Sequence, residues 1–497
     1  MFQLLNQVIR ISAQLLLVPL FLAAWGPAIY KDWVVLFSIM SFLTTCNLGA
    51  GTYFANRFIE LVARGERSAL RRELRTALFC ALTVGIVVLL AGYAAMIAYD
   101  SQGFLASTAM GRKVIWECLV LMTFPVSYSF CEEILRSMYR AEGEFNRGEC
   151  VFAIYAVVLL ISVATVLALR MPPMVAASCY FVVPALLFAA VIIDLKHRYA
   201  DIVIGFRVPT RTELRVIVAP SLLFFTAPLS VALVQSGPII LFGALGVAAV
   251  PVLSYTLVRV VAGLARQAAY QFAIGSGIEM ARHHLQGERQ DCYRLYQATG
   301  QIVTGLVGLF SGFILWATAP FLAFWTHGTV PSDSIMLICF LGGLFLSAPG
   351  QAGLMLLNFA NYPRPLAIAW CGQAVIGLAL SAALVPSFGV AAAAFGFAVV
   401  ESVATGLFLP LVVQRRFGYS AIGQLARSFA VGALAFGWSA LVASAIFRLG
   451  LGGLEGLVLD GLLWAVITIP PFGMVMLPPP QRRRLLSRLR GLVARFA

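Results

Sequence analysis

Apolar stretches of about 20 residues recur from one end of the chain to the other, separated by short polar gaps. Each is long enough for a helix to cross a hydrocarbon core of roughly 30 Å. They are too long and too uniformly apolar for the strands of an outer-membrane barrel. The pattern predicts an all-α polytopic membrane protein with about fourteen transmembrane helices, at 2–24, 33–55, 77–99, 113–134, 150–169, 175–193, 215–241, 246–278, 298–319, 334–358, 366–385, 390–412, 428–447 and 456–477.

The basic residues lie mainly in alternate gaps between these stretches. If both ends of the chain are cytoplasmic, most of the 35 Lys and Arg fall on the cytoplasmic side. The opposite gaps hold Lys31, Arg112, Lys113, Arg170 and Arg448. This bias predicts an N-in, C-in topology with an even number of spans.

Composition agrees with this class of protein. Hydrophobic residues make up 61% of the chain, charged residues make up 11%, and the mean hydropathy is +0.92. The net charge of +14 is explained by a cytoplasmic face that meets anionic lipid headgroups, so no nucleic-acid partner is predicted.

No cofactor or metal site is predicted. The nine cysteines are scattered singly, which argues against both a disulfide frame and a metal centre. The chain has no Gly-Lys-Ser/Thr loop that would cradle phosphates. Any pumping must therefore use an ion gradient, the membrane potential or the substrate gradient.

A weak internal repeat divides the chain. Gly65-Glu66-Arg67 and Gly287-Glu288-Arg289 each follow the second span of a six-span half. We predict an axis along the membrane normal between the halves. The predicted parts are an N-terminal six-helix lobe (1–195), a cytoplasmic linker (196–214), a C-terminal six-helix lobe (215–413), two additional helices (414–477) and a basic amphipathic tail (478–497).

The first span carries a polar stripe. Asn6, Arg10 and Gln14 are spaced i, i+4 and i+8, so they share one helix face. An arginine within the bilayer costs on the order of 2.5–3.5 kcal/mol, so it favours a polar cavity or a partner. Snorkelling to the headgroups is the alternative for Arg10, but it does not explain the amides.

The eighth span repeats this pattern. Tyr255, Arg259, Arg266 and Tyr270 lie along one face. Neither stripe contains a carboxylate, so these cations favour an anionic ligand, and a phosphate or diphosphate suits the guanidinium fork. Snorkelling is the alternative for Arg266, whereas Arg259 lies deeper.

Two acids are placed well inside spans. Glu117 lies in the fourth span and Glu401 in the twelfth. A buried carboxylate can carry a coupling proton or bind sodium, so both are candidates for ion coupling. The alternative is that each lies near a helix end or satisfies a neighbouring helix.

Several short motifs resemble those of Wzx-type polysaccharide (O-antigen) flippases of the multidrug/oligosaccharidyl-lipid/polysaccharide (MOP) exporter superfamily. They are Trp25-Gly26-Pro27 with Tyr30 and Trp33, Asn47-Leu48-Gly49-Ala50-Gly51, Arg64-Gly65-Glu66-Arg67 and Tyr139-Arg140-Ala141-Glu142-Gly143. The resemblance covers nearly the whole chain. It implies two six-helix lobes around a central cavity that is lined by spans 1, 2, 7 and 8.

The resemblance also implies a function. The expected substrate is an undecaprenyl-diphosphate-linked oligosaccharide, moved from the cytoplasmic to the outer leaflet of the bacterial inner membrane by alternating access. The expected partners are this substrate, membrane lipids and other membrane proteins of polysaccharide assembly. Arg10 would then face Arg259 and Arg266 from the opposite lobe.

Two other classes of function fit the sequence less well. A multidrug antiporter of the same fold would need an acid in the first or seventh span, and neither has one. A membrane polymerase or ligase would need a large outer loop, whereas the outer gaps here are about a dozen residues long.

Overall fold

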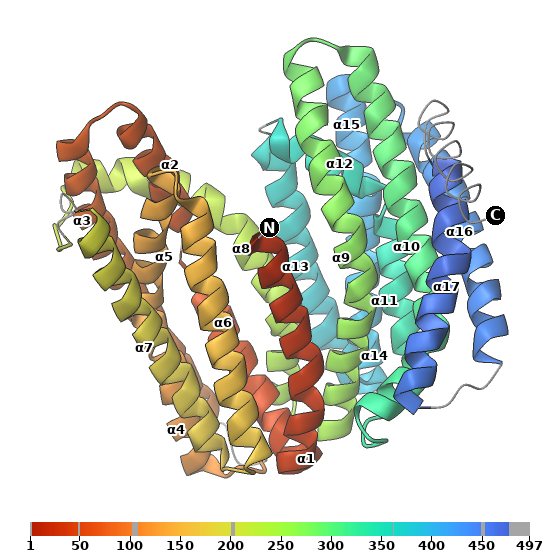
Figure 1. Ribbon diagram of the computed structural model, residues 1–497, viewed down its shortest axis with the longest axis horizontal. Coiled ribbons are helices and arrows are strands. Elements are labelled where there is room, and N and C mark those ends of the chain that lie inside the picture. Colours follow the sequence, from red (N-terminus) through yellow and green to blue (C-terminus); the bar gives the residue numbers. More distant parts are fainter. Residues whose placement is uncertain are drawn as a thin grey trace, which may run out of the picture. The chain divides into compact units, whose positions relative to one another are not determined.

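The computed structural model describes residues 2–47, 50–101, 108–199, 204–360, 362–448 and 453–476. Within these ranges every regular element is helical (Figure 1). In chain order they are α1 (Phe2–Thr45), α2 (Ala50–Ala63), α3 (Arg67–Ser101), α4 (Arg112–Thr123), α5 (Val126–Ala141), α6 (Phe145–Ala168), α7 (Pro173–Arg198), α8 (Arg211–Ala244), α9 (Ala249–Leu285), α10 (Arg289–Trp325), α11 (Ser334–Ser347), α12 (Gly350–Phe359), α13 (Pro363–Phe388), α14 (Ala391–Glu401), the π-helix η2 (Ser402–Phe408), α15 (Leu409–Phe417), α16 (Ala421–Phe447) and α17 (Gly453–Met476).

The all-helical membrane fold predicted from the hydrophobic pattern is confirmed. Among the described residues, 11 helices are long and apolar enough to cross a membrane, or 12 if one bent pair forms a single span. The first predicted span (2–24) lies within α1, and the second (33–55) covers the end of α1 and the start of α2. Among the helices that could cross a membrane, α1 is counted once, as Leu16–Thr45. The total of fourteen and the N-in, C-in topology stay predictions.

The described chain divides into two compact units. Unit 1 contains 1–256, 325–330 and 370–397, and unit 2 contains 257–324, 331–369 and 398–497. The predicted six-helix lobes and the linker stay predictions, and the amphipathic tail lies outside the described residues. The helices α16 and α17 lie within 414–477, and their assignment as two additional helices beyond the lobes stays a prediction.

A glycine break divides α1 into two helical segments in unit 1. Gly26 has φ 71°, a backbone conformation that residues other than glycine rarely adopt, and Pro27 follows it. The second segment therefore starts at Pro27, earlier than the predicted start at residue 33. Trp25 donates its indole N–H to the carbonyl of Met171 at 2.9 Å and packs edge-on against Trp33. The Trp-Gly-Pro motif is thus a structural corner.

A second break separates α1 from α2, where the Asn47–Gly51 motif lies. Asn47 donates its amide to Glu133 Oε2 at 2.9 Å. A Cβ at Gly51 would lie 2.3 Å from Glu133 Oε1, so this carboxylate of α5 sits against the first turn of α2. Glycine is required there because a side chain would displace the carboxylate.

The Tyr139–Gly143 motif forms a polar network in unit 1. Tyr139 donates its hydroxyl to Asp194 Oδ2 at 2.6 Å, and Arg147 donates its Nε to the same oxygen at 3.0 Å. Arg67, at the start of α3, pairs with Glu142. The motif therefore ties α3, α6 and α7 to the end of α5.

The polar segment before α8 ends in a capping box. The Thr210 hydroxyl accepts from the Glu213 N–H, and the Glu213 carboxylate accepts from the Thr210 N–H. Arg207 also donates to Glu213 at 3.0 Å. These hydrogen bonds lower the pKa of the Glu213 carboxyl, and the bond from the Thr210 backbone has the largest effect. The carboxylate of the cap therefore stays charged at neutral pH.

The Gly-Glu-Arg repeat forms the same turn twice. Gly65 and Gly287 have φ values of 72° and 77°. In each turn the glutamate N–H bonds to the carbonyl five residues earlier, at 3.0 and 2.9 Å. This is a glycine-terminated helix end, which satisfies carbonyls that the helix leaves unpaired.

Unit 2 contains a broken helix pair. The α11 and α12 axes are bent by 56° where Ala348 and Pro349 interrupt the helix. Gln424 of α16 donates its amide to the Pro349 carbonyl at 2.9 Å. The side chain of a neighbouring helix therefore supplies a donor at the break.

The α11–α12 break packs directly on the π-helix η2, also in unit 2. A Cβ at Gly350 would lie 1.7 Å from the Thr405 carbonyl oxygen, and one at Gly406 would lie 2.3 Å from the Leu346 carbonyl oxygen. Two irregular backbones are thus in contact without side chains between them. We call this contact the double break, meaning residues 346–350 and 401–406.

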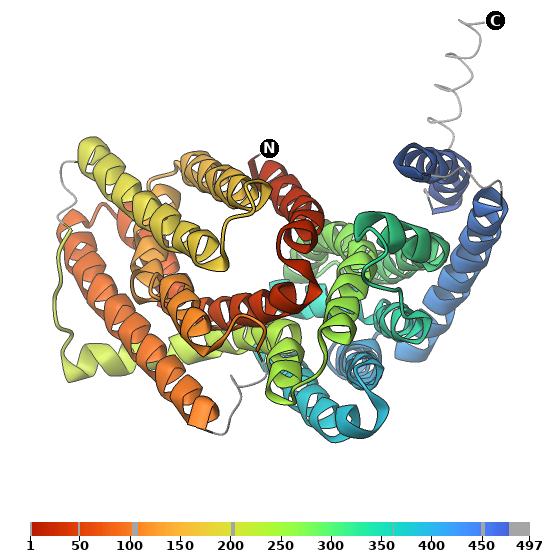
Figure 2. The same ribbon diagram turned by 90° about the horizontal axis from the view of Figure 1, so that it is seen from below.

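The two C-terminal helices complete the core of unit 2. Figures 1 and 2 show α16 and α17 side by side. Trp464 donates its indole N–H to Ser439 at 2.8 Å, and Ser439 donates to the Leu309 carbonyl of α10. One hydrogen-bonded chain therefore connects α17, α16 and α10.

The double break predicts an intolerance of side chains at Gly350. We expect Gly350→Ala to lower the thermal unfolding temperature of the purified protein, because overpacking against a fixed carbonyl costs about 1–3 kcal/mol. Gly342→Ala, on α11, is the control, since no atom lies within 4 Å of its added Cβ. Equal unfolding temperatures for the two variants would contradict the contact.

Candidate functional site

An ion pair lies among the membrane-spanning helices of unit 2. Arg266 of α9 donates Nη1 to Glu401 Oε1 at 2.6 Å and Nη2 to Oε2 at 2.8 Å. This two-pronged geometry is the strong form of an arginine–carboxylate contact. Ser347 donates its hydroxyl to Glu401 Oε1 at 3.1 Å.

The double break positions these groups. Ser347 is the last residue of α11, and Glu401 is the last residue of α14, immediately before the π-helix. π-Helical turns are rare and occur often at functional sites. The irregular backbone therefore holds the carboxylate and hydroxyl at the same junction.

The two charges differ strongly in exposure. The Arg266 side chain is 46% exposed, whereas that of Glu401 is 10% exposed. A charged group at this depth is costly against hydrocarbon, so the accessible side of the guanidinium is expected to face water or a polar group. The pair thus presents a cation in front of a buried anion.

This arrangement links two residues that the sequence had assigned separate roles. Arg266 was predicted to bind substrate and Glu401 to couple an ion, and the structure brings them into direct contact. The guanidinium of Arg266 is held by Glu401, and its role in substrate binding stays a prediction. Ser347 was missed, and no motif marks it.

The other residues of the α9 stripe have different surroundings. Tyr255 is 1% exposed and packs edge-on against Phe242, with their ring centroids 4.9 Å apart. Arg259 is partly buried one turn further along α9. Arg259 is engaged by neighbouring groups, so its role in substrate binding stays a prediction.

The predicted stripe on the first span cannot be placed at the level of side chains. Asn6, Arg10 and Gln14 lie in the helical α1. Their side chains lie outside the part of the chain that the structure describes. Their role in anion binding stays a prediction.

Glu117 lies in the second turn of α4 in unit 1. Its side chain is 35% exposed, and its Oε1 is 3.9 Å from the Lys113 ammonium. This position matches the alternative in which the acid lies near a helix end. Its role in ion coupling stays a prediction.

One buried acid escaped sequence reasoning. Asp460, in α17, is 2% exposed, and its Oδ1 has no hydrogen-bond partner among the described residues. The residue lies close to the start of the last predicted span, so the sequence did not mark it as membrane-embedded. Its burial follows from the packing of α17 against α16.

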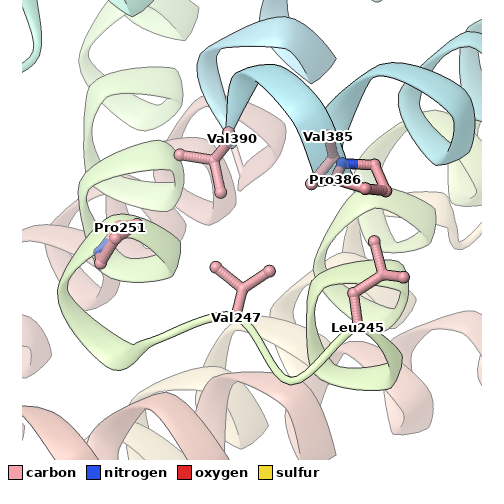
Figure 3. Close-up of a pocket in the computed structure, with 7 residues that line it drawn as sticks. Leu245, Val247, Pro251, Val385, Pro386 and Val390 are labelled. Atoms are coloured by element: carbon pink, nitrogen blue, oxygen red, sulfur yellow. The ribbon is translucent and has the colours of Figure 1, made fainter.

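Unit 1 contains an apolar pocket of about 440 Å³. Leu245, Val247 and Pro251 come from the α8–α9 connection and the start of α9, and Val385, Pro386 and Val390 come from the α13–α14 junction (Figure 3). The lining offers no charged donor for a phosphate. In the described residues, no group of three or more His, Cys, Asp and Glu side chains could hold a metal ion.

Comparison with known proteins identifies the fold. No protein-family model and no curated protein matches this sequence. The structure is similar to the lipid II flippase MurJ in an inward closed conformation, with a TM-score of 0.69 and 11% identity over 95% of this chain and 98% of MurJ. It is also similar to an inward-facing multidrug resistance MATE family transporter of the MOP superfamily, with a TM-score of 0.66 and 14% identity over 88% and 96% of the two chains.

A third similar structure is a MATE protein in complex with MaL6, with a TM-score of 0.52 and 13% identity over 90% and 94% of the chains. The chain has the fold of MOP superfamily transporters. At these identities the likeness establishes the fold, and the proteins that share it are membrane transporters, not enzymes.

The two members of the ion pair differ in exposure, so removing each should lower the stability of the protein by a different amount. We expect Arg266→Ala to destabilise the protein by about 3–5 kcal/mol, because it leaves the buried Glu401 carboxylate without a counter-charge. Glu401→Ala should cost less, since Arg266 is half exposed. The double variant should be more stable than Arg266→Ala, as judged by thermal unfolding in detergent; additive losses would contradict the pairing.

Proposed function

We propose that this protein is a flippase that moves an undecaprenyl-diphosphate-linked oligosaccharide from the cytoplasmic to the outer leaflet of the bacterial inner membrane by alternating access. The observation that carries the proposal is the half-exposed guanidinium of Arg266 within a membrane-spanning helix. Such a group can bind a phosphate only if a polar space reaches it, and a transporter provides that space. The fold, similar to that of a lipid II flippase, supports the same class of activity.

In this proposal the arginines act as the headgroup site. Arg259 and Arg266 lie two turns, about 10 Å, apart on α9, so they would bind one diphosphate if both side chains converge on it. Arg10 would contribute from α1, with Asn6, Gln14 and Tyr255 as polar neighbours. The sugars would fill the aqueous space, and the prenyl chain would stay in the bilayer. Other membrane proteins of polysaccharide assembly are the expected partners.

An ion-coupled multidrug antiporter is the second candidate. The MATE structures share the fold, and Glu401 supplies a buried acid of the kind that can carry a coupling proton. Arg266 neutralises that acid, which makes a binding site for cationic drugs less favourable. Increased resistance to cationic drugs on expression, without any effect on surface glycans, would favour this candidate over the flippase.

The flippase proposal is tested in a bacterial host that lacks its own oligosaccharide flippase. We expect the wild type to restore surface glycan. Arg10→Ala and Arg259→Ala should each lower transport about 10- to 100-fold at matched expression, because a charge-assisted hydrogen bond contributes about 1.5–3 kcal/mol. Surface glycan would be quantified by labelling, across hosts with several glycan types.

One lysine substitution and one alanine substitution of a distant arginine serve as controls. Arg259→Lys keeps the charge but loses the planar fork, so it should retain partial activity. Arg294→Ala removes a 69% exposed cation elsewhere on unit 2 and should leave transport unchanged. Full activity of Arg10→Ala and of Arg259→Ala would remove these two residues from the anion site while keeping the function and Arg266.

A further inference from the structure

The guanidinium fork of Arg266 is already occupied by an internal anion. Both of its terminal nitrogens donate to the Glu401 carboxylate, at 2.6 and 2.8 Å. A phosphate binds arginine through the same paired donors. The Glu401 carboxylate therefore occupies the position that a substrate phosphate would take on Arg266.

Only the arginine side of this pair is accessible. Glu401 as a whole is 7% exposed and lies behind the half-exposed guanidinium. An incoming anion would meet a neutral pair, which attracts it weakly. Displacing an ionised Glu401 would also leave a buried charge unpaired, which proteins avoid. Both obstacles disappear if Glu401 is protonated.

The hydroxyl beside Glu401 can form a hydrogen bond with the carboxyl group in either protonation state. Ser347 is buried and now donates to Oε1; a hydroxyl can also accept a hydrogen bond from a protonated carboxyl. Arg266 is the charged side chain in contact with Glu401 among the described residues. The helices that adjoin Glu401 within unit 2 carry other charged or titratable groups. They are Arg259, Tyr270, Glu279, Arg282, His283 and His284 on α9, Cys339 on α11, Arg415 and Arg416 at the far end of α15, and Arg427 on α16.

We propose that Glu401 is an internal counter-ion, which a phosphate group of the substrate displaces from Arg266 as Glu401 takes up one proton. The proposal rests on the proposed flippase function and adds its coupling. The proton comes from the aqueous phase: a hydronium ion protonates the carboxylate, water is released, and no other covalent bond changes. Phosphate binding at this site is therefore linked to the uptake of one proton.

Glu401 lies where a change in its hydrogen bonds can affect the backbone of two helices. The carboxylate lies at the double break, where Ser347 ends α11 and Glu401 precedes η2. Release of Glu401 from Arg266 would leave it bound to Ser347 alone. The charge state of the site is thereby connected to the two irregular spans.

The test measures binding of a short-chain prenyl-diphospho-N-acetylglucosamine to the purified full-length protein in nanodiscs. The diphosphate of this probe is a diester and does not titrate between about pH 5.5 and about pH 8.5, so a pH effect reports on the protein. Methyl-diphospho-N-acetylglucosamine, which lacks the prenyl chain, distinguishes a lipid-linked phosphate from a free one. Proton uptake on binding is recorded with a pH indicator in weakly buffered solution.

For the wild type we expect affinity to weaken by up to about tenfold per pH unit in the alkaline range, with nearly one proton taken up per probe bound there. Glu401→Gln should bind with little dependence on pH, more tightly than the wild type at the alkaline end, and without proton uptake. Glu401→Asp should recover the pH dependence. Glu279→Gln, which removes an exposed acid from α9, the helix that carries Arg266, should behave as the wild type.

The outcomes separate this proposal from the proposed function. Tight binding by the wild type without pH dependence or proton uptake would overturn the exchange and leave the flippase function standing. Unchanged binding by Arg266→Ala would place the phosphate elsewhere and also overturn the exchange. Failure of the wild type to bind either probe at any pH, while it restores no glycan in any host, would reject the function itself.

Discussion

The structure depends on the requirement that backbone polar groups within a bilayer find partners inside the protein. Regular helices meet it by themselves, but this chain interrupts its helices at several places. At two of the described interruptions a side chain from another helix reaches the break. Gln424 donates to the Pro349 carbonyl, and the Glu133 carboxylate packs on the first turn of α2. At these two places a polar side chain therefore lies beside the irregular backbone.

The same requirement explains where charge is tolerated. Glu401 is buried in unit 2, and it is stabilised by two arginine donors and one hydroxyl. Asp460 is equally buried, although its Oδ1 has no such partner among the described residues. A protein that only had to be stable would gain by replacing these groups with apolar ones. Both buried acids are therefore costly to the stability of the fold.

Sequence reasoning predicted the regular parts of this fold well. Hydrophobic length locates the helices, because a span must be about 20 apolar residues whatever its neighbours are. The break at Gly26 falls in the predicted gap between residues 24 and 33, but the helix resumes directly at Pro27. The break at Pro349 falls inside the predicted span 334–358, which hydrophobic length alone predicts as one helix. The π-helix could not be predicted, since residues 402–408 have the same apolar character as any other span.

The candidate site was predicted only in part, for a related reason. Arg266 and Glu401 were each recognised as unusual residues within spans. Their pairing was not predictable, because 135 positions separate them and no local spacing connects α9 with α14. Side-chain contacts between distant spans depend on tertiary packing, and periodicity carries no information about it. The sequence therefore predicts Arg266 as an isolated cation, whereas in the structure it is one half of a neutral pair.

The glycine contacts of the double break also have a mechanical consequence. Side chains between two helices act as a compliant layer, which lets one helix tilt while its neighbour adjusts rotamers. Between Gly350 and Thr405, and between Gly406 and Leu346, that layer is missing. Because backbone contacts backbone directly, α12 and η2 cannot rotate independently at this point. A rotation of one helix there must move the other.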